Sequence, residues 1–239
     1  MRHFVDQLLP RWLQLPEVVR TGKPAMSVNA HDDGSAFFAQ FVEALFPLSY
    51  PAARVLGEHL KLAATDREIS VLDLAAGSGV WSVALAELSP RIQIRAVDWP
   101  EVLEVTRRVA KRHGVEQRWT GAPGDLLEAD FGSGHAIATL GHILHSEGVE
   151  RSRQLLKKTY EALAPGGTIA IMEFLPNDER TGPPQALTFA VNMLVNTEKG
   201  GTYTFAEISS WLKEAGFTNA RLLEVPAVSP LVLASKKQG

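Results

Sequence analysis

The chain contains no cysteine. Disulfide bonds, thiolate nucleophiles and thiolate metal ligands are therefore excluded. A lack of disulfides fits a reducing compartment, and we expect a cytoplasmic location. The chain also has little excess of either charge, with 24 lysine and arginine residues against 27 aspartate and glutamate residues. This balance gives no footprint for nucleic acid or for an anionic membrane surface, and we expect neither as a partner.

Long apolar runs are missing as well. No uninterrupted run of 18 apolar residues could span a bilayer. The opening segment, MRHFVDQLLPRW, is interrupted by an acid, a proline and an arginine, which argues against a secretory signal. No GxxxxGK[ST] run is found, so a P-loop is excluded. The apolar fraction of 45% and the charged fraction of 21% are those of an ordinary globular protein.

The first part of the chain has the apolar spacing of helices. One apolar cluster ends near Trp12, a second runs from Phe37 to Phe46, and a polar, glycine-containing stretch over 21–35 separates them. Pro51 is a residue type that favours the first turn of a helix, so we expect another helix from there. We predict a helical N-terminal extension or lid over 1–64 and a second domain over 65–239.

Short apolar strands alternate with amphipathic helices in the second domain. We expect strands at 70–75, 92–97, 116–119, 135–140 and 168–175, with a turn at 165–167 before the fifth. Such alternation indicates a mostly parallel sheet covered on both faces. Two final strands, at 220–225 and 231–235, are joined by a short connection that allows only antiparallel pairing. The predicted fold is α/β, with seven strands arranged as five parallel βα units and a terminal antiparallel hairpin.

The segment VLDLAAGSGVW, at 71–81, is the most informative in the chain. A short strand carrying Asp73 ends in small residues at 75–79, and a helix follows. A turn without bulky side chains lets a ligand approach the backbone, and the helix N-terminus behind it offers unpaired N–H groups. Asp98 ends the next strand, where an acid usually holds the ribose hydroxyls of a nucleotide. The segment predicts a nucleoside-containing cofactor.

Three interpretations of this turn stay open. Gly77 to Ser82 is close to the GxGxxG pattern, which would indicate a nicotinamide or flavin cofactor. Asp73 favours S-adenosylmethionine instead, because an acid just before the turn can interact with the ammonium group of an amino-acid cofactor. A tight turn without a ligand would leave Asp98 unexplained. S-adenosylmethionine is the cofactor that we expect.

Six segments in order resemble a known family. VLDLAAGSG, AVDWPEVLE, GDLLEADF, ILHSE, LAPGGTIAIMEF and GGTYTFAEISSWLKEAGF are similar to segments of the caffeic-acid/hydroxyneurotransmitter-type small-molecule O-methyltransferases, from about Trp12 to the C-terminus. The resemblance implies a class I methyltransferase sheet, S-adenosylmethionine, and O-methylation of a hydroxylated aromatic secondary metabolite such as a phenolic or polyketide. Family members begin with a winged-helix dimerisation domain of roughly a hundred residues. This chain is expected to start just downstream of it, and a homodimer or a separate partner chain is expected.

The resemblance assigns residues to the cofactor. The expected contacts are Asp73, Ala75, Gly77, Asp98, Trp99, Asp125, Leu126 and Gly141. Asp98 would hold the ribose and Asp125 the adenine amino group, while Leu126 and Trp99 would cover the adenine face. Core packing is the alternative for Leu126 and Trp99, and a helix N-cap is the alternative for Asp125.

The resemblance also assigns the catalytic pair. His145, just after the fourth strand, resembles the general base, and Glu173, at the end of the fifth, resembles the acid that orients it. An oxygen nucleophile is weak while protonated, and an imidazole can take its proton as the new bond forms. Simple structural contacts are the alternatives for both residues. His142 is three residues before His145, but a metal site would need further ligands, and we expect no metal.

The pattern departs from the family at several positions. Ala75 replaces the first glycine of the turn, and Ser146 replaces the acid after the histidine. The stretch 200–204 lacks the second acid and the arginine of plant members, although Glu198 lies nearby. A relative that binds the cofactor but decarboxylates or hydroxylates its substrate, or a non-catalytic cofactor-binding subunit, therefore stays open as an alternative.

The acceptor is expected beneath an apolar helix over 183–195, which carries Phe189 and Met193. In the family this segment roofs the acceptor pocket, and a methionine sulfur packs well against an aromatic ring. Ordinary core packing is the alternative for both residues. The expected acceptor is a planar hydroxylated aromatic, and whether O, N or C is methylated stays open.

Overall fold

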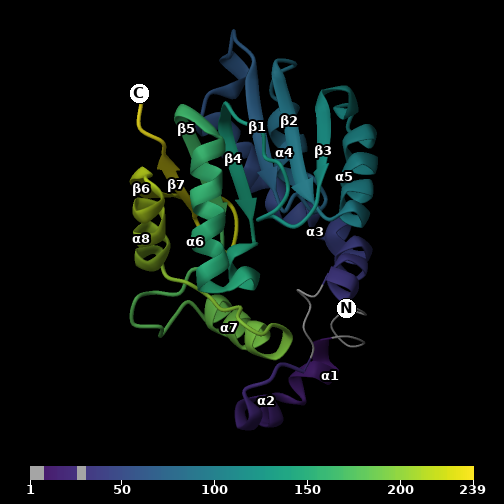
Figure 1. The fold of residues 1–239 in the computed structure, drawn as a ribbon, viewed down its shortest axis with the longest axis vertical. Coiled ribbons are helices and arrows are strands. Elements are labelled where there is room, and N and C mark those ends of the chain that lie inside the picture. The colour runs from purple at the N-terminus through teal and green to yellow at the C-terminus, as the bar shows by residue number, and fades with distance from the viewer. Residues whose placement is uncertain (1–7, 26–30) are drawn as a thin grey trace.

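The computed structural model describes residues 8–25 and 31–239, and the side chains of 8–25 and 42–239. Its centre is a seven-stranded sheet with the order β3-β2-β1-β4-β5-β7-β6 (Figure 1). The strands are Ile69–Leu74 (β1), Ile92–Asp98 (β2), Trp119–Pro123 (β3), His135–Gly141 (β4), Leu163–Met172 (β5), Thr218–Leu223 (β6) and Leu231–Ser235 (β7). β1 to β5 are parallel, and β7 runs antiparallel to both β5 and β6. The predicted α/β fold with a terminal antiparallel hairpin is confirmed.

The chain reverses its direction of travel across the sheet at β1. It proceeds outward from β1 to β2 and β3, then returns so that β4 pairs with the other side of β1. At such a reversal the connections leave the two neighbouring strands in opposite directions, and a crevice opens at their carboxyl ends. The predicted ligand site therefore has a defined place, between the ends of β1 and β4.

Helices cover both faces of the sheet. One face carries His31–His59 (α3), Val80–Ala86 (α4) and Pro100–Arg112 (α5), and the other carries Leu144–Ala162 (α6) and Phe205–Ala215 (α8) (Figure 1). Val71 belongs to the hydrophobic core beneath α3, α4 and α5, and Leu72 belongs to the core beneath α6 and α8. Both residues are fully buried. Successive residues of a strand point to opposite faces, so β1 must be apolar on both sides.

Shorter elements complete the chain. Pro184–Asn196 (α7) lies beyond the carboxyl ends of the parallel strands, and Leu9–Trp12 (α1) and Leu15–Thr21 (α2) contact it (Figure 1). Two 3-10 turns, at Leu62–Ala64 and Glu116–Arg118, connect larger elements. In the part of the chain that the structure describes, no helix combines the length and the apolar character needed to cross a membrane.

The predicted third strand, at 116–119, is wrong. Residues 116–118 form a 3-10 turn, and β3 begins at Trp119. β3 is an edge strand that pairs only with β2. An edge strand tolerates glycine and proline, and β3 contains Gly121 and ends at Pro123.

The predicted break at Pro51 is also wrong. α3 runs without interruption through Pro47 and Pro51, and it includes residues 31–35 of the expected polar separator. Both prolines are exposed, whereas Ala52 and Leu56 of the same helix are fully buried. A proline inside a helix costs about 3 kcal/mol, so the packing of the buried face must outweigh that cost. The side chains of residues 31–41, which include Phe37, lie outside those described.

The turn predicted at 165–167 lies inside β5 rather than before it. Gly166 has a φ of 76°, and the pairing of β4 with β5 shifts register across this segment. A left-handed glycine within a strand produces a bulge, after which pairing resumes. β5 ends at Met172, three residues earlier than expected, because the chain then leaves the sheet towards α7.

Candidate active site

The glycine-rich turn has the conformation that its small residues allow. Ala75, Gly77 and Gly79 have φ values of 51°, 55° and 73°, and α4 begins directly afterwards. A Cβ on Gly79 would lie 2.8 Å from Thr106 Cγ2. Ala75 adopts a left-handed conformation that costs a non-glycine residue about 1 kcal/mol. Because this turn carries no bulky side chains, a ligand that lies above it can approach the backbone closely.

One cavity, which we call the inner cavity, opens above this turn. It is lined by Val42, Leu45, Ser49, Ala75, Ala76, Gly77, Ser78, Val80, Trp81, Asp98, Trp99, Val102, Gly124, Asp125, Leu126, Gly141, His142, Ile143, His145, Ser146 and Glu147. The structure therefore brings together His145 and every residue predicted to hold the cofactor, apart from Asp73. These residues and the candidate base thus share one cavity.

Asp98 is held at the end of β2 by two backbone groups. The N–H groups of Gly77 and Trp99 donate to its two carboxylate oxygens, at 2.9 and 2.8 Å. Burial raises the pKa of Asp98 to about 6, although these two hydrogen bonds oppose the rise. The carboxylate is half-buried and lines the inner cavity. It can therefore accept further hydrogen bonds from a ligand.

Asp73 lies under the turn rather than in the cavity. It is fully buried and accepts hydrogen bonds from the backbone N–H of Ser82 at 3.1 Å, from the Ser82 hydroxyl, and from the Thr139 hydroxyl at 2.8 Å. Desolvation raises the pKa of Asp73 to about 6, although these hydrogen bonds act to lower it. The contacts tie α4 to β4 beneath the turn. A direct contact between Asp73 and a cofactor stays a prediction.

Asp125 belongs to a charged network at the rim of the inner cavity. One carboxylate oxygen accepts from the N–H of Leu127 at 2.8 Å, and the other lies 2.6 Å from Arg151. The hydrogen bond from the Leu127 N–H to the Asp125 side chain closes a short turn. It does not cap a helix, because no helix follows Asp125 directly. Arg151 also pairs with Glu147 at 2.6 Å. Sequence reasoning missed both residues, although their spacing of four on one helix predicts an ion pair.

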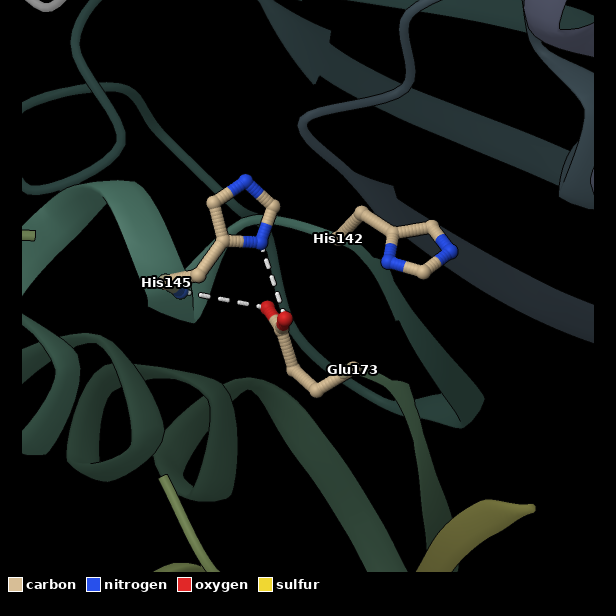
Figure 2. A group of neighbouring side chains, drawn as sticks. All are labelled: His142, His145 and Glu173. Carbon is tan, nitrogen blue, oxygen red and sulfur yellow. Dashed lines mark hydrogen bonds and ion pairs between the residues drawn. The ribbon is translucent and has the colours of Figure 1, made fainter. Parts of the chain in front are cut away.

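His145 and Glu173 form a pair at the carboxyl edge of the sheet. His145 lies in the first turn of α6, and Glu173 directly follows β5. Figure 2 shows that the Glu173 carboxylate contacts the ring and the backbone of His145, with Nδ1 to Oε2 at 2.8 Å and the backbone N–H to Oε1 at 3.2 Å. Glu173 is only 2% exposed. The prediction that these two residues meet is confirmed.

The charge of Glu173 determines which His145 nitrogen carries a proton. Burial alone would raise the pKa of Glu173, but the charge of His145, the hydrogen bonds from it and the nearby His142 together hold that pKa below its ordinary value. An ionised carboxylate only accepts hydrogen bonds, so Nδ1 of His145 must donate. When the ring is neutral, Nε2 then carries the free lone pair. Such a histidine can take a proton from a group in the cavity.

His142 stands beside this pair without joining it. Its Nδ1 is buried and has no hydrogen-bond partner among the described residues, and its backbone φ is 61°. Ligand atoms of His142, His145 and Glu173 all lie within 4.8 Å of one another, which makes them the one metal-like group found in the described residues. The Nδ1 of His145 is engaged with Glu173, which leaves only its Nε2 open to a metal. The expectation of no metal stays a prediction.

Phe189 of α7 contacts His145. Its ring packs edge-on against the His145 ring, with 4.8 Å between centroids, and stacks on Phe174 at 3.9 Å. Met193 is 5% exposed and lines neither the inner cavity nor the one described next. Phe174 was not predicted, although it directly follows the predicted acid Glu173. Phe189 thus lies near the candidate base, and a contact between Met193 and the acceptor stays a prediction.

A second cavity, the outer cavity, lies between α1 and α7 and is bordered by Phe189. It has a volume of about 420 Å³ and is lined by Leu8, Trp12, Pro184, Gln185, Thr188, Phe189 and Asn192. Trp12 donates its indole N–H to Asn192 at 3.1 Å, and Arg11 donates to Asn196 at 2.8 Å. These contacts hold α1 against α7. The outer cavity is therefore built partly from the N-terminal extension.

Several known proteins are similar to this chain in sequence. The sequence profile of the O-methyltransferase domain matches residues 12–218. The chain is 32% identical over 217 residues to a 3-hydroxy-5-methyl-1-naphthoate 3-O-methyltransferase of Streptomyces sahachiroi, covering 89% of this chain and 61% of that protein. It is 31% identical over 240 residues to the acetylserotonin O-methyltransferase of Bos taurus, covering 94% of this chain and 66% of that protein.

Solved structures of several proteins have a fold similar to that of this chain. A Nostoc punctiforme protein with a provisional O-methyltransferase assignment has a TM-score of 0.85 and 31% identity, covering 95% of this chain and 68% of that one. Human N-acetylserotonin methyltransferase in complex with SAM has a TM-score of 0.80 at 24% identity, covering 99% of this chain and 69% of that one, and shows the shared fold. The chain spans 61% of the length of the Streptomyces sahachiroi relative and 68% of a Streptomyces glaucescens relative. On the sequence match over 12–218, the chain belongs to the O-methyltransferase domain family.

Proposed function

We propose that this chain is an S-adenosylmethionine-dependent methyltransferase that O-methylates a hydroxylated aromatic small molecule, with His145 as the general base. The observation that carries the proposal is the His145–Glu173 pair, with 2.8 Å between Nδ1 and Oε2, at the edge of the cavity that also contains Asp98. One cavity thus offers both a nucleoside-binding carboxylate and a proton acceptor.

The residues of the inner cavity fit S-adenosylmethionine. The bare turn at 75–79 admits the amino-acid part, the Asp98 carboxylate can accept from two ribose hydroxyls, and Asp125 offers acceptor oxygens to an adenine amino group. Leu126 and Trp99 supply apolar surface next to these acids. Two proteins of similar structure carry such a ligand, since PigF was solved with SAH and the human enzyme with SAM. We infer the same cofactor for this chain.

The chain's own residues would act on the acceptor as follows. The cofactor supplies a methyl group activated on a sulfonium. Nε2 of His145 removes the proton from the acceptor hydroxyl as the oxygen attacks, and Glu173 stabilises the imidazolium that forms. A positioned general base contributes typically about 10²–10⁴-fold to a rate. The walls of the cavity contribute by holding the hydroxyl oxygen in line with the methyl carbon.

The acceptor that fits best is an aromatic molecule with more than one ring. Phe189 packs edge-on against His145 and stacks on Phe174, so two aromatic rings lie next to the candidate base. Relatives of this chain act on a hydroxynaphthoate and in tetracenomycin polyketide synthesis. We propose a fused-ring phenol of this kind.

Methylation at carbon is the second candidate. The L-tyrosine C(3)-methyltransferase of Streptomyces lavendulae is 30% identical to this chain over 186 residues and has C-methylation in its name. A phenol that loses its proton to a base is also nucleophilic at the neighbouring ring carbons. Mass spectrometry with fragmentation of the product distinguishes a methoxy group from a ring methyl group.

The proposal is tested by calorimetry and by turnover. We expect S-adenosylmethionine to bind and NAD to give no heat, and we expect methyl transfer to 2-naphthol. His145→Ala should bind S-adenosylmethionine within about twofold of the unchanged chain but lose about 10²-fold or more in kcat. His59→Ala, at an exposed position, is the control. Full turnover by His145→Ala, or no binding of S-adenosylmethionine to the unchanged chain, would contradict the proposal.

The expected partners and location are part of the same proposal. A homodimer or a partner chain is predicted from the family resemblance, and light scattering of the purified chain measures it. The predicted cytoplasmic location rests on the cysteine-free composition. Fractionation of the source cells tests it.

A further inference from the structure

His142 adopts a left-handed backbone conformation, which is uncommon for any residue other than glycine. It directly follows β4, with a φ of 61°, and its N–H donates to the carbonyl of Met172 at 2.8 Å. The left-handed region costs a non-glycine residue about 1–2 kcal/mol. Glycine would meet this requirement at lower cost. The local backbone therefore does not explain the presence of histidine.

The side chain of His142 carries a second cost. Its Nδ1 is buried and finds no hydrogen-bond partner among the described residues. A buried polar atom without a partner costs about 1–3 kcal/mol. The centroid of the His142 ring lies 4.9 Å from that of the Phe174 ring. An apolar side chain could fill the same space without that cost. Two costs at one residue are typical of positions that bind a ligand.

The position of His142 indicates which ligand. The residue is half-buried, lines the inner cavity and lies next to Gly141. Its ring centroid is 6.2 Å from that of His145, and Figure 2 shows the two imidazoles side by side above Glu173. Burial lowers the pKa of His142 to about 4, so the ring is neutral near pH 7 and offers one donor and one acceptor nitrogen. Such a ring suits a hydroxyl or carbonyl oxygen.

A metal ion fits the same group less well. Zinc bonds of about 2.1 Å place tetrahedral ligand atoms about 3.4 Å apart. The three candidate ligand atoms lie within 4.8 Å of one another, and the Glu173 carboxylate is already hydrogen-bonded to Nδ1 of His145. An oxygen atom that accepts or donates hydrogen bonds of ordinary length tolerates the wider spacing. The geometry favours an oxygen of the acceptor.

We propose that His142 is a specificity-determining residue that hydrogen-bonds a second oxygen of the acceptor, on the ring carbon next to the hydroxyl that His145 deprotonates. The inference rests on the proposed function, because it needs an aromatic acceptor at His145. It adds a substrate class, namely aromatics that carry two neighbouring oxygens. A neutral imidazole recognises that oxygen and discriminates against acceptors that lack it.

The test compares two probes that differ in one oxygen, 2-naphthol and 2,3-dihydroxynaphthalene. The dissociation constant of each is measured with the S-adenosylhomocysteine complex, and kcat/KM is measured with S-adenosylmethionine. The unchanged chain should prefer the dihydroxy compound by about tenfold or more in both measurements, as expected for one hydrogen bond in a buried site. His142→Ala should reduce this preference to within about twofold.

The ratio of the two probes is independent of how much of a variant is active, so partial misfolding does not obscure it. His142→Asn tolerates the left-handed backbone and retains a polar group, and it should keep part of the preference. His59→Asn, at an exposed position on α3, should leave the ratio unchanged. A preference that survives in His142→Ala overturns the inference, as does equal binding of both probes to the unchanged chain. A preference seen in binding and lost in His142→Ala, without any methyl transfer, supports the inference and contradicts the proposed reaction.

Discussion

At the scale of single residues, Asp98 combines two properties that make it sensitive to pH. It is held by two backbone N–H groups, and burial raises its pKa to about 6. Ribose hydroxyls donate hydrogen bonds to the ionised carboxylate, and protonation removes part of its acceptor capacity. Cofactor affinity should therefore be constant above about pH 7 and fall by up to about tenfold per pH unit below about pH 6.

Calorimetric titration with S-adenosylmethionine from pH 5 to pH 8 measures this dependence. Asp98→Asn is the matched control, because the amide has nearly the same shape and does not titrate. It should bind more weakly than the unchanged chain at pH 8 and show a flat profile. An unchanged affinity between pH 5 and pH 8 in the native chain would show that the carboxylate of Asp98 does not hold the ligand.

The folding contribution of Asp98 has the opposite sign. An exposed aspartate has a pKa of about 3.9, whereas burial raises that of Asp98 to about 6 in the folded chain. The folded state therefore binds the proton more tightly, and this carboxyl favours folding less as the pH rises from about 4 to about 6. The site thus retains an ionised acid near pH 7 at some expense of stability, which is typical of residues kept for binding.

Glu173 provides a sharper test of the catalytic pair. Glu173→Gln keeps the volume and an acceptor oxygen, but it loses the charge that stabilises the imidazolium of His145 and fixes its tautomer. We expect kcat to fall by about 10²-fold, with the dissociation constant of S-adenosylmethionine unchanged within about twofold. Single-turnover kinetics separate the two effects. A variant with full kcat would show that Glu173 has only a packing role.

At the scale of elements, the start of α6 depends on the loop that follows α7. α6 contains Gly148 with a φ of 77° and a ψ of 171°, so the helix is kinked just after His145. The loop packs there: a Cβ on Gly148 would lie 2.9 Å from the Lys199 Cβ, and the Gly201 N–H donates to the His145 carbonyl at 2.8 Å. Backbone contacts from 199–201 therefore support His145 in the region where plant relatives are expected to place a second acid.

Gly148→Ala should disturb both stability and catalysis. A side chain at this φ is strained by about 1–3 kcal/mol, and the contact with Lys199 adds to the strain. Since the displaced loop supports His145, kcat should fall by about tenfold, while S-adenosylmethionine binding stays within about twofold. Gly114→Ala is the control: Gly114 also has a positive φ, of 70°, but a Cβ added there would have no described heavy atom within 4 Å beyond its chain neighbours.

Denaturant unfolding and steady-state kinetics on both variants distinguish strain from loop displacement. Gly114→Ala should lose about 1 kcal/mol of unfolding free energy and keep full activity. If Gly148→Ala behaves like Gly114→Ala, the loop contact does not position the base.

Elements whose signals are local in the sequence could be predicted, and those set by distant partners could not. The turn at 75–79 and Asp98 are recognisable because the turn needs small residues and the acid follows at a fixed spacing. β3 was misplaced because its glycine and proline are tolerated only at an edge, which depends on the strand order. α3 was divided at Pro51 because only its packing on α4 and α5 shows which face is exposed.

The candidate site shows the same division. The His145–Glu173 pair was expected from the family resemblance, since 28 residues separate the two in the sequence. The stacking of Phe174 on Phe189 and the bond between Arg151 and Asp125 join elements that no local pattern connects. Asp73 was assigned to the cofactor, but its partners Ser82 and Thr139 are recognisable only once α4 and β4 are placed.

At the scale of the whole molecule, the reversal of strand order between β1 and β4 concentrates the chemistry in one place. β1 and β2 deliver the turn and Asp98, whereas β4 and β5 deliver His145 and Glu173. The N-terminal extension contributes to both cavities, through Val42 and Leu45 to the inner one and Trp12 to the outer one. The division of the chain at residue 64 stays a prediction, and the extension is in close contact with the rest.

The central claim is that the nucleoside of S-adenosylmethionine lies across this edge with its methyl donor facing His145. A crystal structure of the chain with S-adenosylhomocysteine tests it most directly. We predict both ribose hydroxyls within hydrogen-bond distance of the Asp98 carboxylate, and the cofactor sulfur on the side of the inner cavity lined by His145. An inner cavity without the ligand under saturating conditions, or a ribose that does not contact Asp98, would contradict the account.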